Sequence, residues 1–277
     1  MALTVTEFIP QLWSARFLAN LHKNLVYGKI ANKDYEGELK YGSKVRISHI
    51  GPITISDYST TAGVAAVEDV KGDGTWLEIT EQKAFNFKVE DIVAVQSNAR
   101  LVDEAMGEAA YAMGDTIDQF IAGHYTGAAL TIGDDTTPQN VTVATAYDLL
   151  VDIGVKLDEA NVPAAGRYVV LPAWFLGMLA KDPRFTKEPK VLENGVVEGQ
   201  VVSRMQLYMS NNVPNTAGAK YKILAGTMRA IAYAGQISKI EPYRPEKFFA
   251  DAVKGLFVYG AKVVDGNALL CMTANKA

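Results

Sequence analysis

The chain has 277 residues, of which 49% are hydrophobic, so it can bury one large core or two smaller ones. A formal net charge of −4 argues against a dedicated nucleic-acid binder, which normally carries a basic stripe. The single cysteine, Cys271, excludes a disulfide framework and a thiolate metal cluster. No signal peptide follows Met1, and no apolar run approaches the roughly 20 residues that span a bilayer, so we expect a cytoplasmic, non-membrane setting.

Residues 1–41 are predicted to form an N-terminal arm and a short amphipathic helix. Pro10 suits the first turn of a helix, and Trp13, Phe17 and Leu21 follow at four-residue steps. This apolar face is large for its length. We therefore expect it to dock on the body of the chain or on a neighbouring subunit.

Residues 42–91 are predicted to form one long two-stranded hairpin. Apolar and polar side chains alternate in both halves, as in Val45 and Ile47, and the segment 59–75 between them is small, polar and glycine-rich. A two-stranded ribbon has no core of its own and needs a surface to lie on. That surface could belong to the same chain, but a projecting arm favours another subunit. The expected contact residues are Ile53, Ile55, Tyr58, Val64, Val67, Lys71, Trp76, Phe85 and Phe87.

Residues 98–124 are predicted to form a long amphipathic helix of roughly 40 Å, free of proline. Gly107 and Gly114 lie on its polar flank, where they indicate either loose surface packing or a hinge at which the helix bends. Apolar residues on one face are Val102, Met106, Ala109, Met113 and Phe120, and polar residues opposite are Arg100, Glu104, Glu108, Asp115 and Asp118.

The middle of the chain is predicted to form a compact, mixed α/β unit of about 100 residues. An exposed loop is expected over 181–199, where charge, proline and glycine mix without a helical period. The expected elements are a hairpin with a polar turn at 133–137, a helix from Thr145 to Pro163, a buried strand at 167–171, a helix starting at Pro172, strands at 201–209 and 221–225, and a helix at 228–234.

The chain closes with three predicted strands, at 236–244, 248–264 and 268–274. Asp265-Gly266 is a hairpin turn signal between the last two. We expect an antiparallel sheet on which the long helix buries its methionine and phenylalanine side chains. Pattern alone therefore predicts an α+β chain with two centres of packing, one interrupting the other, and an arm.

No catalytic or metal-binding motif is present. The sequence lacks GxSxG, HExxH, CxxC and the GxxxxGK[ST] phosphate loop. Its three histidines, His22, His49 and His124, fall in three different predicted elements, which disfavours a histidine triad or a metal site. We therefore expect no enzyme activity, no cofactor and no metal.

The order of these elements, with the segments IPQLWSARFLANL, GRYVVLP and SNNVP, resembles the tailed-bacteriophage major capsid protein family of the Hong Kong 97 type. The resemblance implies a structural protein that forms hexamers and pentamers in an icosahedral virion shell around double-stranded DNA, assembled in the host cytoplasm. By the same resemblance, residues 1–41 are the N-terminal arm, 42–91 the extended loop, 92–139 and 236–277 the peripheral domain with spine helix 98–124, and 140–235 the axial domain.

The resemblance also implies a portal and, in some shells, a decoration protein as partners. The predicted N-terminal helix follows almost directly after Met1, so we expect a separate scaffolding protein. The acidic balance predicts weak, non-specific contact with packaged DNA. Two alternatives remain open: an encapsulin-type nanocompartment shell, which holds enzymes, and a small α/β enzyme with a dimerisation arm.

Overall fold

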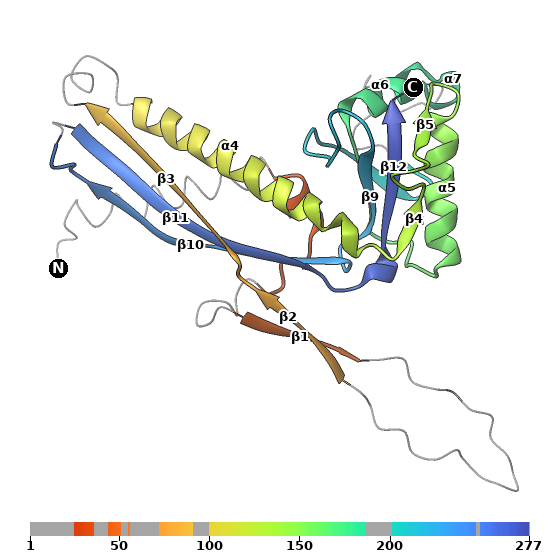
Figure 1. The fold of residues 1–277 in the computed structure, drawn as a ribbon, viewed down its shortest axis with the longest axis horizontal. Coiled ribbons are helices and arrows are strands. Elements are labelled where there is room, and N and C mark those ends of the chain that lie inside the picture. Colours follow the sequence, from red (N-terminus) through yellow and green to blue (C-terminus); the bar gives the residue numbers. More distant parts are fainter. Residues whose placement is uncertain are drawn as a thin grey trace, which may run out of the picture.

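In the computed structural model, the residues described are 25–35, 44–50, 55, 72–90, 100–186, 201–247 and 250–276. They form two bodies, the first of which contains a long helix that runs toward the second, and a two-stranded hairpin projects from the region between the bodies (Figure 1). The predicted N-terminal helix, the tip of the hairpin except Ile55, and most of the loop at 181–199 lie outside these residues.

The first body is helix α4 (Arg100–Ala122) lying along a three-stranded antiparallel sheet with strand order β10-β11-β3. The predicted long helix is thus confirmed, and it continues into a short 3-10 helix, η2 (Gly123–Gly127). Phe120 packs edge-on against Tyr259 of the sheet, with 5.2 Å between ring centroids. The buried face of α4 consists of Met106, Ala110, Met113, Ile117 and Ile121.

Strand β3 (Glu81–Glu90) was predicted as part of the projecting hairpin, and this is wrong. It pairs along its whole length with β11 (Ala250–Val263). The extended stretch that starts at Trp76 therefore divides near Ile79 and Thr80 into two strands of different sheets. Alternation continues through both halves because each has one covered and one open face, so the pattern does not reveal the division.

The predicted closing sheet also differs in its membership. Strands β10 (Ile231–Tyr243) and β11 pair as expected, but β12 (Leu269–Lys276) leaves them and enters the sheet of the second body. Asp265 and Gly266 are therefore a connection between two sheets instead of a hairpin turn. Asp265 Oδ1 accepts a hydrogen bond from Asn267 N (3.1 Å) and caps the 3-10 helix η3 (Gly266–Ala268).

The second body is a mixed seven-stranded sheet that carries helices α5, α6 and α7 (Figure 1). The predicted buried strand RYVVL is confirmed as β6, whose five residues are all buried. The predicted helices at 145–163 and after Pro172 are confirmed as α5 and α6. The elements are β4 (Leu130–Ile132), β5 (Gln139–Val141), α5 (Ala146–Glu159), β6 (Arg167–Leu171), α6 (Ala173–Lys181), α7 (Pro183–Thr186), β7 (Val201–Val202), β8 (Met205–Met209), β9 (Tyr221–Thr227) and β12.

Two turns in this body differ from prediction. Residues 130–141 are not a hairpin, because β4 and β5 both pair parallel with β12 and the Asp134 carboxylate, which accepts from the N–H groups of Thr136 and Thr137, closes a local loop between them. Residues 201–209 are two strands instead of one. Ser203 and Arg204 adopt φ values of 48° and 63° and reverse the chain, so the run predicted as one strand contains a turn.

The predicted helix at 228–234 is also wrong, because Ile231 to Ala234 begin strand β10. Ile231 and Tyr233 belong to the main core, whereas Ala232 and Ala234 belong to a second cluster on the opposite face of the sheet. A strand that is covered on both faces shows no polar alternation. Its sequence therefore lacks the signal that distinguishes a strand from a short buried helix.

Candidate assembly interface

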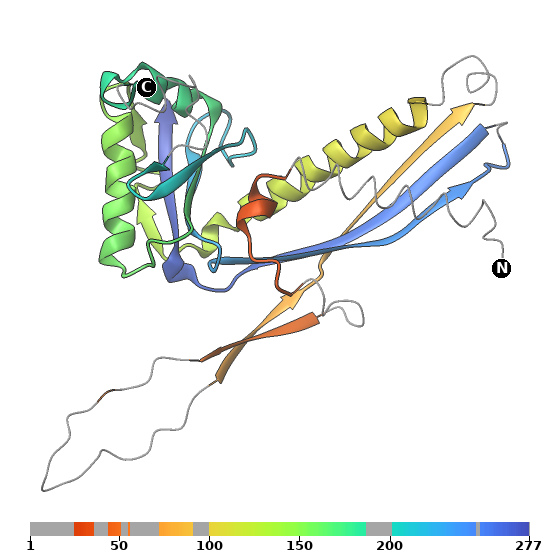
Figure 2. The same cartoon turned by 180° about the vertical axis from the view of Figure 1, so that it is seen from behind.

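The projecting hairpin is formed by β1 (Lys44–Ile50) and β2 (Gly72–Glu78), which pair antiparallel in the register Lys44 opposite Glu78. Val45, Ile47 and Leu77 are buried at its base against Ala232 and Ala234 of β10. The prediction that the ribbon has no support from its own chain is therefore wrong at the base. Beyond this cluster the hairpin points away from both bodies, in the same manner from either side (Figures 1 and 2).

Gly260 of β11 allows the hairpin to approach the sheet closely. A Cβ atom at this position would overlap the carbonyl oxygen of Glu78 and lie 3.1 Å from Cα of Ile79, so any side chain would collide with the backbone of β2 and its continuation. We call Ala232, Ala234 and Gly260 the hairpin seat. The seat fixes where the hairpin leaves the body.

The opposite face of the hairpin is open. Trp76 on this face is 49% exposed; Ile55, which is described apart from the two strands, is 96% exposed. Lys44 and Glu78 form an ion pair of 2.7 Å on this face, and the hydrogen bond from Lys44 holds the pKa of the Glu78 carboxyl below its usual value. An exposed tryptophan beside polar groups is typical of interface hot spots.

The other predicted contact residues divide into two groups. Phe85 and Phe87 lie on β3 and are half-buried against the main core, stacked at 6.2 Å between ring centroids, so the structure does not bring them to the hairpin. Both segments carry the same alternation, so the pattern could not separate them. Ile53, Tyr58, Val64, Val67 and Lys71 lie outside the described residues.

A second attachment point joins residues 25–35 to α4. Helix α2 (Tyr27–Ile30) lies beside α4 (Figure 2), and the Asp118 carboxylate accepts hydrogen bonds from Val26 N (2.7 Å) and Gly28 N (3.2 Å). Asp118 was predicted on the polar face of the long helix, but it is only 2% exposed. This prediction is wrong because a short segment covers that side of α4 and presents free backbone N–H groups to it.

Burial raises the pKa of Asp118 to about 6, although the hydrogen bonds from Val26, Gly28 and Tyr27 act in the opposite direction. The nearby Asp115 carboxylate also raises it. Asp115 itself accepts a hydrogen bond from Asn212 Nδ2 (2.7 Å), which belongs to the turn after β8. Two carboxylates on one helix thus hold the N-terminal segment and the second body.

The two glycines predicted to form a hinge lie within the continuous helix α4. Gly107 is half-buried, and Gly114 is buried instead of lying on a polar flank. Gly114 is four residues before Asp118, on a side of α4 that the sequence pattern assigned to solvent. Their role as a hinge stays a prediction.

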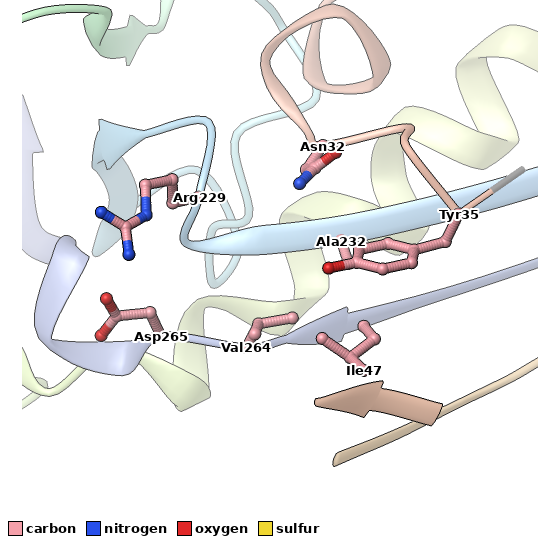
Figure 3. Close-up of a pocket in the computed structure, with 7 residues that line it drawn as sticks. All are labelled: Asn32, Tyr35, Ile47, Arg229, Ala232, Val264 and Asp265. Atoms are coloured by element: carbon pink, nitrogen blue, oxygen red, sulfur yellow. The ribbon is translucent and has the colours of Figure 1, made fainter. Parts of the chain in front are cut away.

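A polar cavity of about 200 Å³ lies between residues 32–35, the base of the hairpin and the start of β10. Its polar lining consists of Asn32 and Tyr35 from one segment, Arg229 from the turn before β10 and Asp265 from the connection after β11, and these residues surround the space in Figure 3. Its apolar lining is Ile47, Ala232 and Val264. No sequence motif indicated this site, because its residues lie far apart in the chain and only tertiary structure, such as the bridge of Asn32 to Ala232 and the pairing of β10 with β11, brings them together.

Within the described part of the chain, no three His, Cys, Asp or Glu side chains gather closely enough to hold a metal ion. Across the same residues, no helix is both long and apolar enough to cross a bilayer. The features at hand for function are therefore surfaces: the open hairpin face, the attachment of residues 25–35, and the polar cavity.

Comparisons with solved structures place this architecture among viral shells. The chain matches a structure from Mycobacterium phage Che8 with 25% identity and a TM-score of 0.73, covering 90% of each chain. It matches the capsid structure of cyanophage P-SCSP1u with 13% identity and a TM-score of 0.64, over 86% of this chain and 85% of the other. A virus-like particle from Pyrococcus furiosus matches with 11% identity and a TM-score of 0.57, over 98% and 100%.

No match was found among curated protein sequences. The profile of the family described as phage capsid protein matches residues 76–271, which is more than two-thirds of the chain. Members of such a family have a structural role, which speaks against the enzyme alternative. The resemblance to tailed-phage major capsid proteins is thus confirmed, and the chain belongs to the phage capsid protein family.

Proposed function

We propose that this chain is a major capsid protein that assembles as hexamers and pentamers into a closed icosahedral shell around double-stranded DNA. In that assignment α4 is the spine helix, the sheet β10-β11-β3 belongs to the peripheral domain, the seven-stranded sheet belongs to the axial domain, and the hairpin β1–β2 is the base of the extended loop. Because β12 pairs with β9, we place the strand at 269–276 in the axial domain, and because β3 pairs with β11, we place 81–90 in the peripheral domain.

The observation that carries the proposal is the hairpin. One face is buried on the seat through Val45, Ile47 and Leu77, and the other exposes Trp76 while the strands point away from the body. A two-stranded hairpin with one open face has no core of its own and needs a second surface on that face. A neighbouring subunit supplies that surface in a shell. Each subunit then lays its hairpin on one neighbour and is itself covered by the hairpin of another.

Shell stability follows from repetition of this contact. Each subunit engages several neighbours at once, and the total buried area reaches the class of obligate interfaces, above roughly 2,000 Å². A single contact can then be modest in strength. This suits a shell that must assemble without trapping wrongly placed subunits.

The charge of the chain suits a mobile cargo. The net charge is −4, and Glu104 and Glu108 of α4 are exposed. A strongly basic lining would hold DNA tightly, whereas a near-neutral or acidic one gives weak, non-specific and salt-dependent contact. Tight duplex binding by isolated subunits at physiological salt would contradict this part of the proposal.

The second candidate is an encapsulin-type shell that holds protein, and the match to a virus-like particle from Pyrococcus furiosus shows only that the fold is shared with it. Shell architecture is common to both candidates, so the cargo must decide between them. The expected partners of a genome-holding shell are a separate scaffolding protein, a portal and, in some shells, a decoration protein.

The proposal is tested by expressing the full chain alone and together with the other structural proteins of its virus. Gradient sedimentation and negative-stain imaging should reveal closed particles of megadalton mass. Particles isolated from infected cells should contain nuclease-protected double-stranded DNA. Particles filled with a single foreign protein would favour the second candidate, and a chain that stays a monomer or dimer under all these conditions would refute both.

A further inference from the structure

We propose that the polar cavity at the hairpin base is a docking site for an amide group carried by an extended segment of a second copy of this chain. This inference rests on the proposed function, since a shell provides the second copy.

The cavity presents donors that lack partners among the described residues, together with the Asp265 carboxylate, of which Oδ1 already accepts from Asn267 N. Arg229, on the exposed turn between β9 and β10, makes no hydrogen bond or ion pair with any described residue, and its guanidinium faces the Asp265 carboxylate across the space without closing a salt bridge (Figure 3). Oδ1 of Asn32 accepts from Asp34 N (2.8 Å), so its amide nitrogen is left to donate elsewhere. The Tyr35 hydroxyl also points into the cavity.

The balance of charge selects the kind of occupant. One guanidinium and one carboxylate line the cavity, so a carboxylate occupant would meet Asp265 and an ammonium occupant would meet Arg229, each with like charge. An amide group satisfies both, because its carbonyl oxygen accepts from Arg229 or Asn32 and its N–H donates to Asp265. Backbone peptide groups and the side chains of Asn and Gln share this chemistry.

The size and place of the cavity limit the occupant to a small group at the base of the hairpin. A volume of about 200 Å³ is below the roughly 300 to 1,000 Å³ of sites for small-molecule ligands. It still accommodates one amide-bearing side chain or a short piece of extended backbone. It lies where the hairpin leaves its seat. A segment bound there would touch Ile47 of the hairpin and Ala232 of the seat together, and would thereby fix the direction of the arm.

The test compares Arg229→Gln and Asp265→Asn in the assembled full-length chain. An asparagine side chain in place of Asp265 would keep the Oδ1 acceptor that caps η3, so the second substitution removes only charge. An amide occupant predicts that both substitutions weaken assembly, each raising the critical subunit concentration about tenfold, the effect of one lost hydrogen bond to a charged group. The matched controls are Lys247→Gln and Glu246→Gln, at exposed residues of the turn between β10 and β11. Each control should change the critical subunit concentration less than about twofold.

The direction of the two effects separates this occupant from others. Weaker assembly of Arg229→Gln together with stronger assembly of Asp265→Asn would indicate a carboxylate occupant and overturn the inference. The reverse pattern would indicate a cationic occupant and overturn it as well. No change in either variant, with normal circular dichroism, would mean that the cavity holds only water, which also overturns it.

A photo-crosslinking residue in place of Tyr35 gives an independent readout. It should join two different subunits of the assembled particle, whereas crosslinks only within one chain would contradict docking. Failure of the unsubstituted chain to form shells would instead count against the proposed function.

Discussion

Asp118 shows how a single buried carboxyl links an N-terminal segment to the long helix. It is 2% exposed and accepts from two backbone N–H groups of residues 26–28. Truncation to alanine leaves the half-buried N–H group of Val26 and the buried N–H group of Gly28 without an acceptor, at a cost of roughly 1–3 kcal/mol for the buried one. We expect Asp118→Ala to release residues 25–35 from α4, seen as faster amide hydrogen exchange in that segment alone.

Asp118 also predicts how stability changes with pH. Its pKa is raised from 3.8 to about 6, so the folded state binds this proton more tightly than the unfolded chain does. The stability that it contributes is fully present below a pH of about 4 and is lost as the pH rises through about 6. Lowering the pH from about 7.5 to about 5 should therefore increase the free energy of unfolding by about 1 kcal/mol through this group.

Asp118→Asn should remove this component from the pH profile measured by urea unfolding of the unassembled subunit. Asp115→Asn is the matched control, since that carboxyl is on the same helix and is hydrogen-bonded to Asn212. The control should keep most of the pH dependence. An unchanged profile in Asp118→Asn would show that another group is responsible.

Burial of this kind is difficult to read from a sequence. Asp118 falls on the polar side of the helical pattern, and nothing in the pattern states that a second segment will cover that side. The positions Met106 and Met113 were correctly predicted as core residues because they face a sheet, a common partner of an amphipathic helix. Arg229, Asn32 and Tyr35 carry no local signal at all, since only tertiary structure brings them together.

The hairpin β1–β2 has one face that packs on the seat of its own chain and one face that is exposed. Leu77 is fully buried on the seat and its neighbour Trp76 is 49% exposed. Leu77→Ala should destabilise the hairpin base by roughly 2–5 kcal/mol, visible as proteolysis within residues 44–78 of the free subunit. Trp76→Ala should leave the free subunit unchanged within about 0.5 kcal/mol but reduce the yield of particles.

Equal effects of these two substitutions on the free subunit would contradict the division of the hairpin into a seated face and an open face. The pair forms its own control, because the residues are adjacent in sequence and both are large and hydrophobic.

Gly260 tests the seat from the other side. Alanine here would bring Cβ into overlap with the Glu78 carbonyl oxygen, so the backbone of the hairpin must shift. We expect Gly260→Ala to lower the melting temperature of the free subunit and to increase hydrogen exchange in β1 and β2. Gly177→Ala, on helix α6 with open space around it, should be neutral or slightly stabilising. A Gly260→Ala subunit with unchanged exchange would show that the seat does not position the hairpin.

The presence of helices and strands was predicted from the sequence better than the pairing of the strands. Helices α4, α5 and α6 and strand β6 have strong periodic patterns or proline starts, and each was found where expected. The destinations of β3 and β12 were not predictable, because alternation says that one face is covered but not which strand lies alongside. The strand at 231–234 was mistaken for a helix because two different clusters cover its two faces.

In the whole molecule, the long helix runs from the first body toward the second, so its shape affects the angle between them. If the chain forms a shell as proposed, we expect a smaller precursor that expands, and Gly107 and Gly114 are the positions where we expect α4 to bend most easily. Replacing both with alanine should slow expansion or change precursor size, measured by time-resolved scattering of assembled shells. Identical precursor diameter and expansion rate would exclude a hinge role for these glycines.

What the hairpin touches in the assembled state decides whether the chain forms a shell in the way proposed. Electron cryomicroscopy of the assembled particle measures this directly. We expect a closed shell in which the hairpin of each subunit leaves its seat and lies with Trp76 against a neighbouring subunit. A small soluble oligomer, or a shell in which the Trp76 face contacts only its own chain, would contradict the proposal.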